Sequence, residues 1–227
     1  MKQPRPRPPI GHTLLDFVSV LPRHRINRTT IHGCPPGDLG PVLVLPGIFH
    51  DDRQTASFRG GLQMLDYMPF GWDQGTNYGP ARQTMDGVTT RLAHLYRDHG
   101  PVRLIGFSMG GLFARWLAQA RPHMIRQVIT VCTPFRDSLN SAWLPIKPLI
   151  GLWRHVDTEA LSFMVAQTPP MAWAALYSPM DGVVAWRSCM EPEAMDHCVE
   201  VRVRHRHAMS EAAVLRAMAG CLAEPKA

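Results

Sequence analysis

One five-residue motif, GFSMG at residues 106–110, restricts the fold of this chain more than any other feature. A strand-like apolar run (101–107) leads into it, and a helix-like run (110–120) follows it. A serine between a strand and a helix, with a glycine two positions away on each side, is typical of a nucleophile elbow. The glycines matter because side chains there would collide in so tight a turn. The motif therefore predicts that Ser108 projects from a sheet edge, although a plain strand–turn–helix connection with a serine N-cap also fits.

The remaining sequence alternates strand-like and helix-like segments, a pattern that favours a mostly parallel sheet with helices on both faces. Apolar and β-branched runs predict about six strands, at 41–47, 67–73, 101–107, 127–133, 171–178 and 197–203. Helix-like segments are expected at 55–65, 83–98, 110–120 and 210–223. With 227 residues and no internal repeat or linker, we expect a single α/β domain over 41–227.

Residues 134–168 interrupt this alternation with an apolar stretch that contains several prolines. The stretch is too long for an ordinary crossover and too apolar for a plain loop, so we expect a small helical cap inserted into the domain. A crossover helix with long flanks is the alternative. Trp143 and Trp153 are the candidates for binding an apolar part of a substrate, although such side chains often pack the core of the cap itself.

Residues 1–40 are expected to form a basic Pro/Arg arm and a lead-in segment. They contain no long apolar region and no cleavage site of a signal peptide, and the chain has no apolar run long enough to span a membrane. The five cysteines show neither CxxC pairs nor zinc-ligand spacing, which predicts reduced thiols and a cytoplasmic protein. A bridge between Cys189 and Cys198 is the alternative.

The formal net charge of +6 favours solubility and weak association of the basic arm with anionic membrane surfaces. The sequence contains no nucleic-acid-binding module and no interleaving of aromatic with basic residues, which excludes nucleic acid as the expected partner. It does not indicate an oligomeric state.

A serine nucleophile needs two backbone N–H groups that stabilise the oxyanion of its tetrahedral intermediate. One is expected from Met109, directly after the nucleophile, and the other from the loop after an early strand. That loop is LVLPGIF, in which Gly47 allows a close turn and Ile48 is the first choice of donor, with Phe49 the second. No metal site is expected from the polar run HDD at 50–52, because adjacent residues do not converge readily on one ion.

The acid and the base of such a site follow the nucleophile in the chain, each on a loop after a strand. Asp181 comes just after a strand-like run and is the candidate acid, although Asp-Gly pairs also form simple turns. Asp157 and Glu159 are weaker candidates, since they lie in the insertion and follow no strand. The candidate bases after the last strand are His205 and His207, and strand alternation places both on the same side.

Six blocks of the sequence together resemble the bacterial lipase-like and esterase-like α/β hydrolases, relatives of the triacylglycerol lipase and PGAP-type groups. The resemblance covers about residues 41–223. It implies an α/β-hydrolase fold, a serine nucleophile, no cofactor and no metal, and a carboxylic ester or thioester as the bond that is cleaved. The blocks are VLVLPGIFHDDRQTASFRGGL, GWDQGTNYGP, LIGFSMGGLFAR, VITVCTPF, LYSPMDGVVAWRSC and EVRVRHRHAMSEAAVLRAMAGCL.

Within the resemblance, Ser108 matches the nucleophile and Asp181 matches the acid of the family's YSxxDGxVxW block. A gapless match of the last block, anchored on AAVLRAMA, assigns the base to His205. Arg204 then stands where the family tends to have Ser, and His207 where it tends to have Gly. A slip of two residues in the loop would assign the base to His207.

The expected function is therefore that of a serine esterase or lipase acting on a small or lipid-like ester. An acyltransferase or thioesterase on the same scaffold is the nearest alternative. A non-catalytic protein that binds a lipid or a partner is the alternative from a different class.

Overall fold

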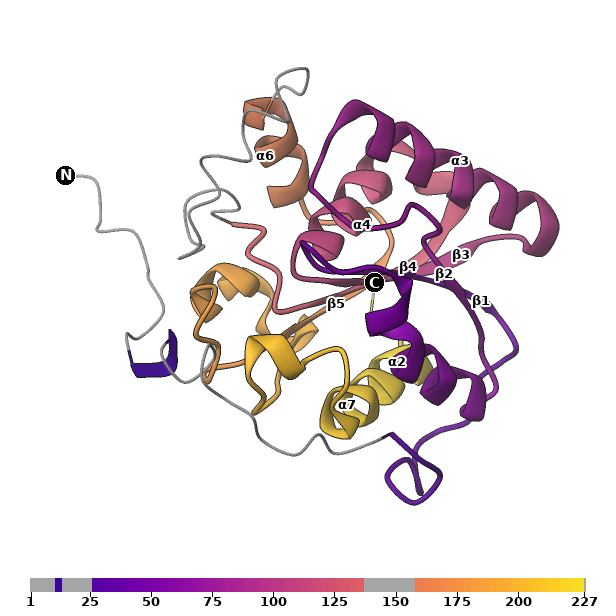
Figure 1. Cartoon of the computed structure of the whole chain (residues 1–227), viewed down its shortest axis with the longest axis vertical. Coiled ribbons are helices and arrows are strands. Elements are labelled where there is room, and N and C mark those ends of the chain that lie inside the picture. Colours follow the sequence, from indigo (N-terminus) through magenta and orange to yellow (C-terminus); the bar gives the residue numbers. More distant parts are fainter. Residues whose placement is uncertain (1–10, 14–25, 137–157, 227) are drawn as a thin grey trace.

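The computed structural model describes residues 11–13, 26–136 and 158–226, and Figure 1 shows their arrangement. Six strands form one sheet in the order β2-β1-β3-β4-β5-β6, and every neighbouring pair is parallel. Each predicted strand is present, with slightly different ends. The strands are β1 (Pro41–Leu45), β2 (Met68–Gly71), β3 (Val102–Phe107), β4 (Ile125–Val131), β5 (Ala172–Tyr177) and β6 (Cys198–Glu200).

Helices cover both faces of this sheet, as the sequence predicts. In Figure 1, α2 and α7 lie on one face, and α3, α4 and α6 lie on the other. The helices are α2 (Asp52–Met64), α3 (Arg82–His99), α4 (Met109–Ala120), α6 (Thr158–Ala166) and α7 (Ala212–Ala223). The described residues also include the short 3₁₀ helices η1 (Pro122–Met124), η3 (Trp186–Cys189), η4 (Pro192–His197) and η5 (His205–His207).

The two faces of the sheet bury two separate cores because successive strand side chains point in opposite directions. In β1, Val42 and Val44 join the core under α2 and α7, whereas Leu43 and Leu45 join the core under α3 and α4. All five residues of β1 are buried. A strand that is covered on both faces reads as a continuous apolar run, which is why the sequence reveals it so clearly.

The lead-in segment before β1 is tied to the edge of the sheet where the strands begin. Arg103 of β3 is buried, and its guanidinium donates to Asp38 over 2.6 Å. Arg126, half exposed, lies 2.9 Å from the same carboxylate. The hydrogen bond from Arg103 is the main reason why the pKa of Asp38 falls to about 2. This ion pair fixes the segment that carries the chain into the sheet.

Part of the N-terminal region packs on the domain rather than away from it. Residues 11–13 form a helical turn, and Thr13 is buried. The backbone of His12 and Thr13 lies so close to Gly182 that a Cβ there would overlap the His12 carbonyl group. Residues 1–10 lie outside the described part of the chain, so the arm and its weak association with membrane surfaces stay predictions.

The expected cap falls largely on residues 137–157, which lie outside the described residues, and it stays a prediction. Its C-terminal end is described as α6, which packs on α4. The buried Arg115 of α4 donates to the carbonyl oxygens of Val165 and Gln167, and its guanidinium lies 3.9 Å from the Phe135 ring centroid. Burial lowers the pKa of Arg115 to about 10, so the side chain stays charged at neutral pH.

Cys189 and Cys198 are free thiols, so the alternative of a bridge between them is not realised. Within the described ranges, no helix combines the length and the apolar character that crossing a membrane requires.

Candidate active site

The parallel sheet brings the candidate residues to one edge. Because all six strands run the same way, their carboxyl ends share an edge, and ligands of open α/β sheets bind there. Ile48 follows β1, Ser108 directly follows β3, Asp181 follows β5 and His205 follows β6. The topology thus brings residues as far apart in the sequence as Ile48 and His205, 157 positions, to the lining of one cavity.

Ser108 occupies a strained turn between β3 and α4. Its φ of 51° and ψ of −118° lie in a region that L-residues rarely adopt. The Ser108 N–H donates to the Val131 carbonyl over 2.8 Å, which joins the turn to the end of β4. A Cβ on Gly106 would overlap the Gly110 carbonyl oxygen, and one on Gly110 would overlap that of Leu45. Both glycines of the motif are therefore required by close backbone approach.

Ser108, His205 and Asp181 form a continuous hydrogen-bonded chain. Nδ1 of His205 lies 2.7 Å from Oδ2 of Asp181, and Nε2 lies 3.0 Å from Oγ of Ser108. An ionised carboxylate only accepts hydrogen bonds, so Nδ1 carries the proton and Nε2 is left to accept from the serine hydroxyl. This tautomer is the one that a base acting on Ser108 requires.

The carboxylate of Asp181 is buried, with a side-chain exposure of 1%, yet it is fully hydrogen-bonded. Its Oδ1 accepts the backbone N–H groups of Val183 and Val184, each over 2.8 Å. Its Oδ2 accepts from His205. Burying a charge is costly unless such donors offset the lost hydration. These donors also hold the carboxylate in the orientation that aims Oδ2 at the imidazole.

Ser178, which sequence reasoning missed, connects the loop of Asp181 to the segment that leads to His205. Its buried hydroxyl donates to the Val203 carbonyl over 2.6 Å. The same oxygen accepts the N–H of Val203 over 3.2 Å and that of Met180 over 3.1 Å. Ser178 stands in the YSxxDGxVxW block, but a contact across 25 residues leaves no local pattern.

His207 does not share the position of His205. Strand β6 ends at Glu200, and η5 turns the chain at residues 205–207, so strand alternation no longer applies there. The His207 N–H donates to the Arg204 carbonyl over 3.0 Å, and its own carbonyl accepts the Ser210 N–H over 2.9 Å. Among the side-chain contacts of the described residues, only His205 of the two histidines reaches Ser108 and Asp181.

Ile48 and Met109, the expected N–H donors to an oxyanion, both line the cavity beside Ser108. Their backbone N–H groups make no hydrogen bond to any residue that the structure describes. Phe49, the second-choice donor, instead gives its N–H to the Asn77 carbonyl over 2.7 Å. The buried Asn77 also donates from Nδ2 to the Pro46 carbonyl over 2.8 Å, so it holds the loop after β1 at two points. Sequence reasoning did not find Asn77, although it lies in the quoted block GWDQGTNYGP.

A cavity of about 180 Å³ opens beside Ser108 and His205. Its walls are mostly apolar, and Arg206 is a charged residue in its lining. Gly47 contributes to this wall; a Cβ there would lie 3.5 Å from that of Ser108, an ordinary contact, so the turn itself does not require glycine. The apolar side chains include Phe107, Leu112, Val131, Val183, Val184 and Met209.

The three residues of the polar run HDD (50–52), after β1, each make contacts that stabilise the surrounding structure. Asp51 caps α2 in a capping box with Gln54, and Asp52 accepts the backbone N–H of Trp72 over 3.0 Å. His50 lines the cavity and donates from Nδ1 to the Ile48 carbonyl over 2.8 Å. Burial lowers the pKa of His50, against the opposing effect of that hydrogen bond, so the ring is neutral at neutral pH.

The described part of the chain places none of the other sequence candidates at this site. Trp143, Trp153 and Asp157 lie outside the described part of the chain, as does the side chain of Glu159. Among the described residues, one group has donor atoms close enough together to hold a metal ion, and it consists of Cys132, Asp181 and His205.

The parallel six-stranded sheet, the helices on both faces and the sharp turn after β3 define the α/β-hydrolase fold, and solved structures confirm it. No family model and no curated protein matches the chain. Similar solved structures include one of the metagenome-derived lipolytic enzymes LipS and LipT. That structure is 14% identical with a TM-score of 0.60, and the match covers 84% of this chain and 96% of that chain.

Two further structures show the same likeness. The pyrethroid hydrolase PytH is 14% identical with a TM-score of 0.56, over 83% of this chain and 99% of that chain. An extracellular α/β-hydrolase from Paenibacillus species is 13% identical with a TM-score of 0.54, over 80% of this chain and 98% of that chain. At these identities the likeness establishes the fold, and the substrate must be argued from the site.

Proposed function

We propose that this protein is a serine hydrolase that cleaves a carboxylic ester, with Ser108 as nucleophile, His205 as base and Asp181 as the acid that orients it. The observation that carries the proposal is the hydrogen-bonded chain from Asp181 through His205 to Ser108, with contacts of 2.7 and 3.0 Å. A nucleophile, a base within hydrogen-bond reach and a group that orients the base are the parts that acyl transfer needs.

In the proposed reaction, Oγ of Ser108 attacks the ester carbonyl carbon while its proton moves to Nε2 of His205. Asp181 stabilises the imidazolium that forms. The tetrahedral intermediate collapses as His205 returns the proton to the leaving alcohol oxygen, and an acyl-enzyme remains. A water molecule then attacks the acyl-enzyme while His205 takes one of its protons. The second tetrahedral intermediate collapses as His205 returns that proton to Oγ of Ser108, which releases the carboxylic acid and restores the free serine.

The developing oxyanion is stabilised by the backbone N–H groups of Ile48 and Met109. Each donor of this kind is worth about 3 kcal/mol of transition-state stabilisation. Met109 begins α4, so the partial positive charge at the helix N-terminus acts in the same direction. Asn77 supports the Ile48 donor because it engages Phe49 and Pro46 on either side of it.

The lining of the cavity supports a substrate with an apolar acyl group. A cavity of about 180 Å³ beside Ser108 accommodates a short acyl chain more readily than a long one. Trp143 and Trp153 lie outside the described residues. They stay the sequence-based candidates for further apolar contacts with the substrate.

A chain-length series of p-nitrophenyl esters tests the proposal. We expect hydrolysis with a preference for acetate and butyrate over palmitate, and loss of turnover in Ser108→Ala. Hydrolysis that survives in Ser108→Ala at the wild-type rate would contradict the mechanism. A thioester panel compares the thioesterase alternative directly with ester hydrolysis. Product analysis with competing alcohols tests the acyltransferase alternative, because an acyltransferase transfers the acyl group to a dilute alcohol in preference to water, whereas a hydrolase releases mainly the acid.

A further inference from the structure

Cys132 lies beside the site and has a backbone conformation that is unfavourable for a residue with a side chain. It directly follows β4, has a φ of 48° and is 1% exposed. Its N–H donates to the Leu176 carbonyl over 2.8 Å, which fixes the turn. A left-handed conformation costs an L-residue about 1–2 kcal/mol, whereas glycine adopts it freely. The chain thus keeps a thiol at a position where glycine would be less strained.

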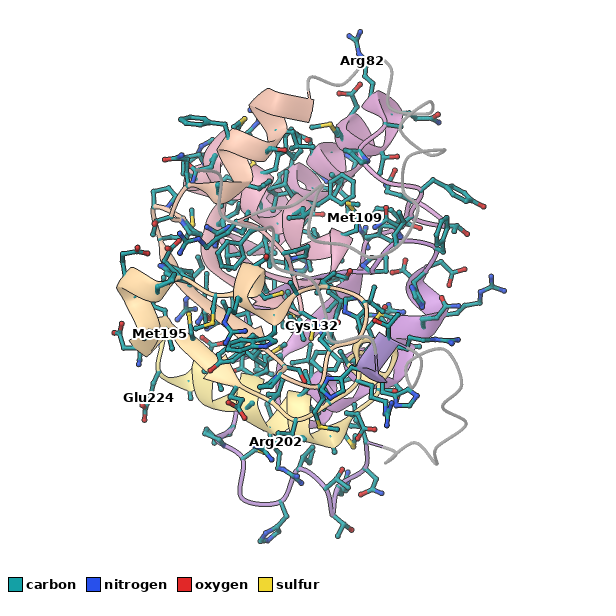
Figure 2. All side chains as sticks on the ribbon, turned by 90° about the vertical axis from the view of Figure 1, so that its left-hand side faces the viewer. Arg82, Met109, Cys132, Met195, Arg202 and Glu224 are labelled. Carbon is teal, nitrogen blue, oxygen red and sulfur yellow. The ribbon has the colours of Figure 1, made fainter. Side chains whose placement is uncertain are left out.

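The Cys132 sulfur belongs to a cluster of three different donors. Sγ of Cys132, a carboxylate oxygen of Asp181 and a ring nitrogen of His205 all lie within 4.8 Å of one another. Cys132 and Asp181 are buried, and His205 is largely buried. Figure 2 labels Cys132 near the middle of the view and Arg202 and Glu224 toward its rim.

This donor set matches the preferences of Zn²⁺, which takes thiolate, imidazole and carboxylate ligands, with three protein ligands in its open sites. Tetrahedral bonds of about 2.1 Å put two N or O ligands about 3.4 Å apart. The Asp181–His205 pair, now at 2.7 Å, would have to open by less than 1 Å. The amides of Val183 and Val184 hold the other carboxylate oxygen, a support of the kind that orients metal ligands.

The cavity beside Ser108 provides a path for an ion to reach two of these donors, Cys132 and His205. Cys132, Ser108 and His205 all contribute to its lining. An ion therefore approaches from the same side as the ester.

We propose that Cys132, Asp181 and His205 bind Zn²⁺ or a similar thiophilic divalent cation, and that this binding switches the hydrolase off. The inhibition, but not the binding, rests on the proposed function. Coordination releases the thiol proton of Cys132. At the imidazole it either replaces the Nδ1 proton or takes the Nε2 lone pair that accepts from Ser108. Both ring nitrogens are in use, one toward Asp181 and one toward Ser108, so coordination of either removes the base.

Zn²⁺ titration of p-nitrophenyl acetate hydrolysis tests the inhibition. Each protein is compared with its own rate in the presence of a chelator. We expect inhibition that the chelator reverses, with the half-inhibitory concentration raised at least about tenfold in Cys132→Ala and Cys132→Ser. The matched control is Cys221→Ala, since Cys221 lies on α7 beside Trp173 and Ala174, near the start of β5 and away from the site. Equal inhibition of the wild type and Cys132→Ala overturns the proposal.

Co²⁺ binding gives a readout that does not depend on turnover. In Ser108→Ala we expect a thiolate-to-Co²⁺ charge-transfer absorption that Zn²⁺ displaces and that Cys132→Ala removes. Absence of the band in folded Ser108→Ala overturns the proposal. If the ester assay shows no turnover but the band appears, the proposed function fails while the metal site stands.

Discussion

At the scale of single residues, position relative to the end of β6 separates two histidines that look equivalent in the sequence. The strand ends at Glu200, and η5 then turns the chain so that the His205 ring meets both Asp181 and Ser108. The short distance from Nδ1 to the carboxylate fixes the tautomer and leaves Nε2 as the acceptor. The proposed base role of His205 therefore rests on local backbone geometry and not on the histidine side chain alone.

Exchange of each histidine for alanine measures this difference. We expect His205→Ala to lower kcat by at least about 10⁴-fold, because the nucleophile loses its base. His207→Ala, the matched control two residues away, should keep kcat within about threefold of the wild type, since His207 does not belong to the lining of the cavity beside Ser108. The opposite pattern in a p-nitrophenyl acetate assay would assign the base to His207.

The hydroxyl of Ser178 helps to hold Asp181 and His205 in this arrangement, so its removal should impair their positioning. In Ser178→Ala the backbone groups of Val203 lose their partner, so we expect a free energy of unfolding lower by about 1–3 kcal/mol. We also expect kcat to fall about tenfold with little change in KM, because the acid and base loops lose their common hydrogen bonds.

Ser188→Ala is the matched control for Ser178→Ala in urea unfolding and in kinetics. Ser188 is equally buried, but its Oγ has no hydrogen-bond partner among the described residues. Its replacement should therefore leave stability unchanged or raise it. Equal losses in both variants would show that Ser178 has no special role.

At the scale of elements, the loops at the carboxyl edge are held by partners that lie far away in sequence. The loop after β1 is fixed by Asn77, and the loop after β5 is fixed by Ser178 and covered by residues 11–13. Parallel strands supply the common edge, but these contacts set where each loop lies on it. Pre-organisation of this kind is what places a base within reach of its nucleophile.

Gly182→Ala tests the contact between the N-terminal turn and the acid loop. The new Cβ would overlap the His12 carbonyl group, so either the turn or the Asp181 loop must shift. We expect stability to fall by about 1–3 kcal/mol, with a lower kcat. In a chain that lacks residues 1–13, the same exchange should cost much less, and this non-additivity is the measurement.

Gly220→Ala serves as the control because a Cβ there meets no atom within 4 Å. Gly220 lies inside α7, so alanine should stabilise the protein by about 0.5–1 kcal/mol. If Gly182→Ala costs the same with and without residues 1–13, the turn does not contact the loop in solution.

At the scale of the whole molecule, the sheet has the proposed active-site residues at one edge and an ion pair at the other. Asp38 links the lead-in segment to Arg103 and Arg126 where the strands begin. The pKa of Asp38, lowered from 3.8 to about 2, means that the folded state favours the ionised carboxylate. This contribution to stability is complete above pH 4 and is lost as the pH falls toward 2.

Asp38→Asn should therefore destabilise the protein at pH 7 by about 2 kcal/mol, a figure kept modest because the carboxylate is partly exposed to water. The difference from the wild type should shrink as the pH falls from 4 toward 2 in urea unfolding measurements. Asp98→Asn is the control, since Asp98 pairs with Arg97 on the exposed surface and such pairs contribute little. A difference that stays constant with pH would rule out the ion pair as its cause.

The sequence predicts the sheet and the turn at Ser108 well because both depend on local constraints. Buried parallel strands are apolar throughout, and the turn needs glycines at residues 106 and 110. The choice between His205 and His207 depended on where β6 ends, which periodicity does not reveal. Asn77 and Ser178 act through contacts that span 31 and 25 residues, so a single sequence carries no signal of their roles.

The central claim is that Ser108 is a nucleophile activated by His205 and Asp181. Labelling of the folded protein with a fluorophosphonate probe, followed by mass spectrometry of the peptides, tests it most directly. We predict a single adduct on Ser108, lost in Ser108→Ala and formed far more slowly in His205→Ala, but unaffected in His207→Ala. A folded protein that stays unlabelled, or that is labelled at another serine, would contradict the claim.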